Sequence, residues 1–193
     1  MSKHVIYIPG IGDHRRYGQK IVIQLWRFFG LTPHYFPLGW NIAEGFNVKQ
    51  KRLLDLVEKL HSSKDSVSLV GISAGASAAV NTFAKSDAVS SVVCICGKIN
   101  NPQTIGSHVL IPNPDFGESM SSVGASLALL GNKTKNIMSI HPWKDQTVPV
   151  PDTIIKGAKE KTLPGWSHIS GIFFSVILGS RAISKFIRSN KAV

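Results

Sequence analysis

Ser73 is the residue whose setting most strongly suggests chemistry, because the pentapeptide Gly71-Ile72-Ser73-Ala74-Gly75 has the Gly-x-Ser-x-Gly spacing. The spacing alone is weak, since glycine and serine are common residues. Here it follows an apolar run at 67–72 and precedes small residues at 74–85, which suit a helix packed closely on a sheet. A serine on such a strand-to-helix turn is strained and presents its Oγ at the positive end of the helix dipole. The pattern indicates a nucleophile, and the alternative is an ordinary tight turn with a passive serine.

A serine nucleophile needs a base, and His168 is the preferred candidate among seven histidines. It lies between the last predicted strand and the last predicted helix, which places it on the same sheet edge as Ser73. His141, at the end of the preceding strand, is the second choice. His14, in the first loop, is a candidate substrate contact. The remaining histidines have no supporting context: His4, His34, His61 and His108.

The base in turn needs a carboxylate that holds its tautomer, and Asp145 is the preferred candidate. It follows the predicted strand 136–141 and stands in a loop closed by Val148-Pro149. Two alternatives remain open. Asp152 follows Pro151 and fits a helix amino end, and Asp115 belongs to a predicted flap.

An oxyanion would be bound by two backbone N–H groups, one from the residue after the serine and one from the loop after the first strand. Ala74 provides the first. In Pro9-Gly10-Ile11-Gly12, Ile11 is the expected second donor and Gly12 the next choice. This loop lacks the Gly-x-Gly-x-x-Gly pattern of a dinucleotide site.

Substrate-binding side chains are harder to predict. We expect His14, Trp143 and Trp166 to contact the substrate, and aromatic residues at positions 40 and 116 are weaker candidates. Cys94 and Cys96 lie two apart in an apolar run, so a strand would point both to one face. We interpret them as reduced core residues and expect neither a metal site nor an organic cofactor.

Strand and helix patterns alternate, which predicts an α/β fold: a three-layer, doubly wound, mostly parallel sheet of about six strands with helices on both faces. The expected strands cover 4–8, 34–38, 66–72, 90–96, 136–141 and 160–163. The expected helices cover 18–29, 46–61, 74–85, 121–130, 151–158 and 169–189. Residues 1–193 are expected to form a single domain with little or no lid and a flap at 98–119, which is rich in Gly, Pro, Asn and Ser.

The chain carries 22 Lys and Arg against 11 Asp and Glu, a net charge of +11. The basic residues are scattered along the chain, among them Arg15, Arg16 and Lys191. This distribution favours a solvated basic surface over nucleic-acid binding. Contact with anionic surfaces stays open. The apolar stretch 169–179 is shorter than the ~20 residues of a membrane-spanning helix. A strand at 4–8 replaces any signal peptide, which favours a cytoplasmic location.

The chain resembles the α/β-hydrolase superfamily, in particular its small, nearly lidless members of the retinoblastoma-binding-protein-9-like or minimal lipase and esterase type. The resemblance rests on Tyr7-Ile8-Pro9-Gly10, on the pentapeptide around Ser73, on Asp145-Gln146-Thr147-Val148-Pro149 and on Trp166-Ser167-His168. The order Ser73, Asp145, His168 is the order of that superfamily. Two positions depart from it: Pro-Gly replaces the His-Gly of many lipases, and Ser167 precedes the histidine where many members have glycine.

The resemblance implies a serine hydrolase that cleaves a small-molecule carboxylic ester through an acyl-enzyme. A thioesterase or peptidase using the same triad is an alternative. So is a catalytically weak protein that binds an acidic partner through its basic surface. The oligomeric state is left open.

Overall fold

A computed structural model of the chain describes residues 2–14, 18–62 and 64–190. Its centre is a sheet of six parallel strands in the order β2-β1-β3-β4-β5-β6. The strands are β1 (Lys3–Ile8), β2 (Thr32–Tyr35), β3 (Ser66–Ile72), β4 (Val89–Ile95), β5 (Ile137–Pro142) and β6 (Lys159–Leu163). The predicted fold class is confirmed, and every strand pair is parallel.

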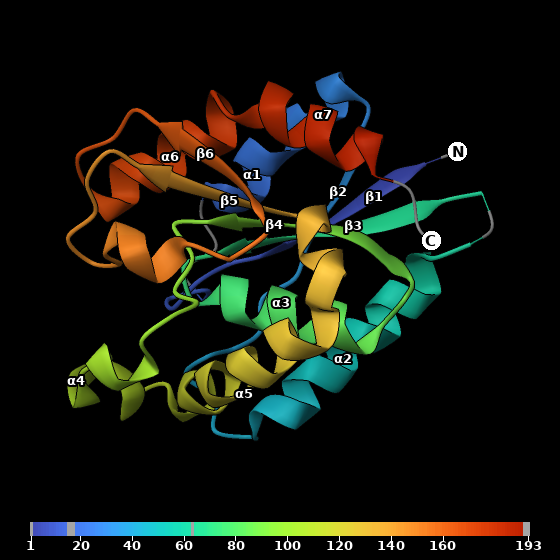
Figure 1. Cartoon of the computed structure of the whole chain (residues 1–193). Helices are drawn as coiled ribbons and strands as arrows, with labels where there is room; N and C mark the ends of the chain where they lie inside the picture. The colour runs from blue at the N-terminus through green and yellow to red at the C-terminus, as the bar shows by residue number, and fades with distance from the viewer. Residues whose placement is uncertain (1, 15–17, 63, 191–193) are drawn as a thin grey trace.

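Helices cover both faces of the sheet (Figure 1). One layer contains α2 (Phe46–Leu60), α3 (Gly75–Lys85) and α5 (Pro114–Leu130). The other contains α1 (Gln19–Val22), the 3-10 helix η1 (Ile23–Phe29), α6 (His168–Ile177) and α7 (Ser180–Ser189). Short elements complete the chain: α4 (Ser107–Leu110) and the 3-10 helices η2 (Pro102–Thr104), η3 (Gly131–Asn136) and η4 (Val150–Thr153).

Strands β3 and β4 lie in the middle of the sheet, and all their residues are buried. Side chains alternate between the two faces, so Ile6 and Ile8 of β1 join the core beneath α2, α3 and α5, whereas Val5 and Tyr7 join the core beneath α6 and α7. Near-continuous apolar strands are what a parallel sheet covered on both faces requires. The carboxyl ends of all six strands consequently meet at one edge, where the predicted site residues lie.

A buried charge cluster joins α2 to α5. The fully buried Lys49 Nζ donates to the carbonyls of Leu38, Gly39 and Ile42. It also lies 3.1 Å from Asp115 Oδ2, and that oxygen accepts a hydrogen bond from the N–H of Glu44. A buried ammonium is tolerated only with such complete partnering. Asp115 is therefore a structural residue, which removes it as a catalytic candidate.

Several element boundaries differ from the predictions. The helix expected at 151–158 is only the short 3-10 helix η4, because Pro149 and Pro151 remove N–H donors and Gly157 has a φ of 84°. The helix expected at 169–189 is two helices, α6 and α7, with a 62° bend at Gly179. A Cβ on Gly179 would lie 2.2 Å from the Ser175 carbonyl oxygen, so the bend leaves no room for a side chain at this position.

Three further boundaries moved. The helix expected at 18–29 is divided between α1 and η1. Strand β2 covers Thr32–Tyr35 instead of 34–38, and it ends two residues before Pro37, which has no N–H for the sheet. Helix α5 begins at Pro114, where proline is favoured at the first helical position, so the part of the predicted flap outside α5 is 98–113, which contains η2 and α4.

Among the described residues, no single helix is long and apolar enough to cross a membrane, and α6 with α7 meets that criterion only when the bent pair is counted together. Arg15, Arg16 and Lys191, part of the scattered basic charge, lie outside the described residues.

Candidate active site

Ser73 occupies the turn between β3 and α3 with a φ of 53°, a left-handed conformation that is costly for a residue with a side chain. The flanking glycines are required by crowding. A Cβ on Gly71 would lie 2.4 Å from the Gly75 carbonyl oxygen, and a Cβ on Gly75 would lie 2.2 Å from the Ile8 carbonyl oxygen. The N–H of Ser73 donates to Ile95 O at 2.9 Å, which ties the strained turn to β4.

His168 connects Ser73 to Asp145 through two short hydrogen bonds. The ring Nε2 lies 2.9 Å from Ser73 Oγ, and Nδ1 lies 2.7 Å from Asp145 Oδ2. The three residues come from three different loops at the carboxyl edge of the sheet. With Nδ1 protonated and donating to the carboxylate, Nε2 has a free lone pair for the serine proton.

Asp145 is held in its ionised form. Burial alone would raise its pKa, but the hydrogen bond from His168, those from the N–H groups of Val148 and Thr147, and the charge of a protonated His168 together lower the pKa below its usual value. Its Oδ1 accepts both backbone bonds at 2.9 Å, and its Oδ2 is left for the imidazole. The carboxylate is thus fixed in position and charge.

The position of His168 follows from the start of α6. Ser167 is the N-cap residue, with extended backbone angles, and forms a reciprocal capping box with Ser170. This explains the serine that departs from the family pattern: an extended N-cap residue does not need glycine, and serine caps the helix. Capping fixes the first turn of α6 and therefore the histidine that begins it.

The predicted oxyanion donors lie next to Ser73. Ile11 and Ser73 line the same cavity, and a Cβ on Gly10 would lie 2.9 Å from Ser73 Cβ. In the described part of the chain, the N–H groups of Ile11 and Ala74 have no backbone acceptor, so both stay available to a ligand. Gly12 has a φ of 87°, which gives this loop its sharp turn.

Asp13 anchors the loop 9–12, which contains the predicted donor Ile11, a role that sequence patterns did not indicate. It is buried, its Oδ2 accepts from the N–H of Gly39 at 2.6 Å, and its carbonyl accepts from Tyr35 Oη at 3.4 Å. The partners are 22 and 26 residues away. Only the adjacency of β1 and β2 brings them together, so no local spacing could have revealed the contact.

Two cavities open at Ser73. The larger, of about 880 Å³, runs between α1 and α6 and is mostly apolar, with Val22, Ile72, Ile172, Phe173 and Val176 among its walls. The smaller, of about 430 Å³, extends toward Lys98, Phe116 and Pro149. His108 of α4 lines both, although its sequence context gave no reason to select it. Ser73 therefore lies at the junction of a large apolar space and a smaller one.

The flap that lines the smaller cavity is anchored by a second buried ion pair. Lys98 Nζ pairs with Asp152 Oδ2 and donates to Thr104 Oγ1 at 2.7 Å, and the Lys98 N–H donates to Ser73 O at 3.3 Å. Asn101 donates to the other oxygen of Asp152. Asp152 is therefore fully engaged by the flap, which removes it as an alternative partner for His168.

The predicted substrate contacts are not in these cavities. Neither cavity is lined by His14, Trp143 or Trp166, and all three are exposed. The two tryptophans instead pack edge to face, with ring centroids 5.2 Å apart. Trp40 is a core residue whose Nε1 donates to Pro9 O at 3.2 Å.

His141, the second-choice base, is buried with its Nδ1 3.1 Å from Pro142 O and does not contact Ser73. Its position at the end of β5 is as predicted, but its ring is turned to its own backbone. Among the described residues, His168 is the one histidine that hydrogen-bonds to Ser73.

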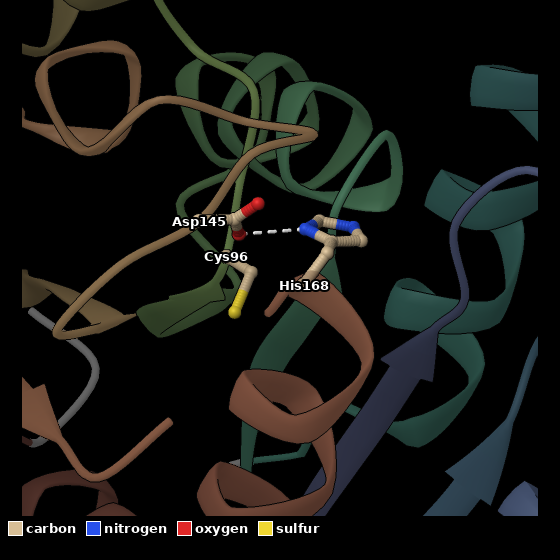
Figure 2. Close-up of side chains that lie close together, drawn as sticks. All are labelled: Cys96, Asp145 and His168. Carbon is tan, nitrogen blue, oxygen red and sulfur yellow. Dashed lines mark hydrogen bonds and ion pairs between the residues drawn. The ribbon is translucent and has the colours of Figure 1, made fainter. Parts of the chain in front are cut away.

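Cys96 lies beside the Asp145–His168 pair, as Figure 2 shows, and this was not predicted. Its Sγ and the donor atoms of the other two residues lie within 4.8 Å of one another. The prediction that Cys94 and Cys96 share a face is wrong, because β4 ends at Ile95 and Cys96 has a φ of 48°, which turns it into the opposite core. Burial, and then the charge of Asp145, raise the thiol pKa to about 12. His168 Nδ1 and Asp145 Oδ2 are bonded to each other at 2.7 Å, so we interpret Cys96 as a packing neighbour of this pair.

No protein-family model matches the chain, and no curated protein matches it in sequence. Solved structures do match in fold. The α/β hydrolase GrgF from Penicillium sp. sh18 has a TM-score of 0.72 at 13% identity, covering 100% of this chain and 92% of that one. The esterase domain of a Rhodothermus marinus protein has a TM-score of 0.71 at 12% identity, covering 97% and 87%. Est1E from Butyrivibrio proteoclasticus has a TM-score of 0.69 at 14% identity, and the match covers 97% of this chain and 88% of that one.

These structures define the architecture of the chain: it has the α/β-hydrolase fold. At such low identity the likeness extends to the fold and not to a substrate.

Proposed function

We propose that the protein is a serine hydrolase that cleaves a carboxylic ester through an acyl-enzyme, with Ser73 as nucleophile, His168 as base and Asp145 as its orienting carboxylate. The observation that carries this proposal is the continuous hydrogen-bond chain from Ser73 Oγ through both ring nitrogens of His168 to Asp145 Oδ2, at 2.9 and 2.7 Å. The fold of the esterases and hydrolases named above is consistent with it.

In the acylation step, Ser73 Oγ attacks the ester carbonyl carbon while His168 Nε2 takes the hydroxyl proton. The carbonyl oxygen becomes an oxyanion that accepts from the N–H groups of Ile11 and Ala74. The imidazolium then gives its proton to the departing alcohol oxygen, and the carbon–oxygen bond breaks. Asp145 stabilises the imidazolium and keeps Nδ1 protonated throughout.

In the deacylation step, a water molecule replaces the alcohol. His168 Nε2 removes a proton from the water as its oxygen attacks the acyl carbon, and the same oxyanion donors act again. Collapse of the intermediate returns the proton to Ser73 Oγ and releases the carboxylic acid. Both steps use the same three side chains, and no cofactor takes part in either.

The shape of the site supports an ester with a sizeable apolar group. The 880 Å³ cavity is walled mainly by aliphatic and aromatic side chains, so it would take the apolar part of the substrate, and the 430 Å³ cavity would take the smaller part. Tyr7 Oη is one polar group on the floor of the larger cavity, with Gln19 Oε1 3.5 Å away.

The test is a panel of p-nitrophenyl esters of increasing acyl length, with a thioester and an anilide alongside, assayed on the native chain and on Ser73→Ala. For the native chain we expect ester turnover that rises with acyl length. In Ser73→Ala we expect turnover to fall by about 10⁴-fold or more while the protein still folds. Labelling of the native chain by a fluorophosphonate, and none of Ser73→Ala, would support the same nucleophile. Full activity in Ser73→Ala would refute the proposal, and preferred thioester or anilide turnover would reassign the bond.

A further inference from the structure

Helix α6 exposes large apolar side chains on its outer side, although Val176 and Ile172 pack on the core. It buries Gly171, Ser175 and Val176, and the Ser175 hydroxyl has no hydrogen-bond partner among the described residues. On the opposite side it exposes Ile169 by 80% and Phe173 by 55%. An ordinary surface helix buries its large apolar residues and exposes its polar ones. The outer side of α6 therefore presents apolar surface that nothing in the described chain covers.

The neighbouring helix supplies charge of one sign. The exposed residues Arg181, Lys185 and Arg188 recur on one side of α7, while Ile183 and Ile187 are buried on the other. Leu178, exposed by 63%, lies at the bend between the two helices. We call the surface formed by these outer residues the α6–α7 face: Ile169, Phe173, Leu178, Arg181, Lys185 and Arg188.

The same layer continues into η1. Trp26 Nε1 donates to Val176 O at 3.0 Å, and Ser184 Oγ donates to Phe29 O at 2.8 Å, so η1 lies against the end of α6 and against α7. Figure 1 shows α1, α6 and α7 on one side of the sheet. Phe28 and Arg27 of η1 are also exposed, so the apolar and basic character extends across the layer.

Acidic residues are excluded from this layer. No Asp or Glu occurs at 14–43 or at 161–190, the two segments that contain α1, η1, α6 and α7. The exposed carboxylates of the described residues lie elsewhere: Asp55 and Glu58 on α2, Glu118 on α5, and Asp87 and Glu160 at the amino edge of the sheet. The basic residues of this layer, namely Lys20, Arg27, Arg181, Lys185 and Arg188, are therefore not balanced by a carboxylate of the same segments.

We propose that the α6–α7 face docks the protein on an anionic lipid surface, with the basic residues at the headgroups and Ile169, Phe173 and Leu178 in the interfacial region. Protruding apolar side chains beside basic ones, with no acidic residue between them, have the chemistry of interfacial binding. Ile169 and Phe173 also line the 880 Å³ cavity, so the surface that would meet the lipid is continuous with the cavity wall. The docking itself does not depend on the proposed hydrolysis.

A second copy of the chain fits this face less well. A two-fold interface places the same patch against itself, which would set Arg181, Lys185 and Arg188 against like charges with no carboxylate nearby to pair with them. An acidic protein would match the charge, but it would leave unexplained why Ile169 and Phe173 are both exposed and part of the cavity lining. A lipid surface accounts for both features.

The test is co-sedimentation of Ser73→Ala with sucrose-loaded vesicles of phosphatidylcholine alone and of phosphatidylcholine mixed with phosphatidylglycerol. We expect binding to the mixed vesicles, little binding to the neutral ones, and weakening as salt is raised. Because this variant lacks the proposed nucleophile, a negative result would refute the docking alone. Failure of fluorophosphonate to label the native chain would refute the proposed nucleophile alone.

Matched variants test whether this face is responsible. Arg181→Gln with Lys185→Gln is expected to weaken binding by about fivefold per residue. Lys135→Gln with Lys156→Gln removes the same charge near the amino edge of the sheet and is expected to change binding far less. Leu178→Ser is expected to weaken binding by about tenfold. Leu129→Ser, on α5 in the other layer and exposed by 77%, is expected to have no effect.

Three outcomes would overturn the proposal. If the Arg181/Lys185 and Lys135/Lys156 double variants weakened vesicle binding equally, the net charge of the protein would drive binding without a specific face. Full binding of Leu178→Ser would mean that charge alone acts, as for an acidic protein partner. If sedimentation velocity without vesicles shows a dimer that Leu178→Ser dissociates, the face is an interface between copies.

Discussion

Helices α3 and α6 begin on either side of the Ser73–His168 hydrogen bond, yet they are packed in opposite ways. All residues of α3 from 75 to 83 are buried between the sheet, α2 and α5, whereas α6 buries three of its ten residues. Inside its layer, α3 is also joined to α5 by side-chain hydrogen bonds such as Ser77–Ser119 at 2.7 Å. The nucleophile is thus held by a helix buried along most of its length, and the base by a helix that is buried at only a few positions.

The difference shows how a strained serine and a correctly placed histidine can be supported by separate means. Strain at Ser73 persists because the surroundings leave the backbone no alternative. His168 depends instead on directional contacts, namely the Ser167 cap and the bond to Asp145. If this comparison is right, changes near α6 should act on activity more than on stability, and changes in α3 should do the reverse.

The largest effect is expected for Asp145→Asn. The amide cannot stabilise the imidazolium and favours the wrong tautomer of His168, so kcat should fall by about 10⁴-fold while the fold is kept. Ester hydrolysis and thermal unfolding of the same preparation measure both. Asp87→Asn, at an exposed surface pair with Lys133, is the matched control and should keep full activity. Retained activity in Asp145→Asn would mean that another group orients the base.

The next effect concerns the glycines of the two helices. Gly75→Ala would place a Cβ 2.2 Å from a backbone oxygen of β1 and should destabilise the protein by about 3 kcal/mol or more. In Gly171→Ala the new Cβ would meet Pro142 and Cys96 side-chain atoms at 2.8 to 3.1 Å, and these can shift, so about 1 to 2 kcal/mol is expected. Urea unfolding measures both free energies.

Gly124→Ala is the control for this pair, because nothing lies within 4 Å of the new Cβ on α5. Alanine has the better helix propensity, so this variant should be slightly stabilised. If Gly171→Ala proved as destabilising as Gly75→Ala, the idea that α6 is loosely packed would be wrong.

A smaller effect is expected from polar contacts. Asn81 is buried, donates to Ser119 O at 2.8 Å and accepts from Ser126 Oγ at 2.7 Å, so Asn81→Ala should cost about 2 kcal/mol. Ser170→Ala removes half of the α6 capping box and should cost about 1 kcal/mol. Unlike Asn81→Ala, it should also lower kcat, since it loosens the turn that carries His168. Unchanged kcat in Ser170→Ala would show that Asp145 alone positions the base.

The smallest effect is a dependence of stability on pH. The pKa of Asp145 is lower in the folded chain than its ordinary 3.8, so its ionised form stabilises the fold. That contribution is fully present above pH 3.8 and is lost as the pH falls through the folded pKa. The difference in unfolding free energy between the native chain and Asp145→Asn should therefore be constant near neutral pH and shrink in acid. A difference that grew in acid would contradict the lowered pKa.

The sequence indicated the elements around Ser73 well because each signal there is local. The two glycines, the apolar run before them and the small residues after them are within one strand–turn–helix unit, and the structure has that unit. Parallel strands collect their carboxyl ends at one edge, so Asp145 and His168 could be expected near Ser73 from strand order alone. Their roles in a reaction remain our proposal.

Contacts between distant segments could not be anticipated. The bond from Gly39 to Asp13, the pair of Lys98 with Asp152, and the place of Cys96 beside His168 depend on backbone turns that propensities do not encode. The positions of the two exposed tryptophans could not be anticipated for a related reason: residues close in sequence to Asp145 and His168 need not line the same cavities. Trp143 and Trp166 do not line either cavity and pack against each other.

That tryptophan pair gives the protein an optical reporter of its own geometry. Trp143 stands two residues before Asp145, and Trp166 two residues before His168, so the 5.2 Å indole contact spans the same two loops as the carboxylate–imidazole bond. The other two tryptophans, Trp26 and Trp40, are fully buried and provide a constant background. A motion that moves these two loops apart would separate the base from its carboxylate and the two solvent-facing indoles together, so fluorescence and near-ultraviolet circular dichroism should follow it without an added label.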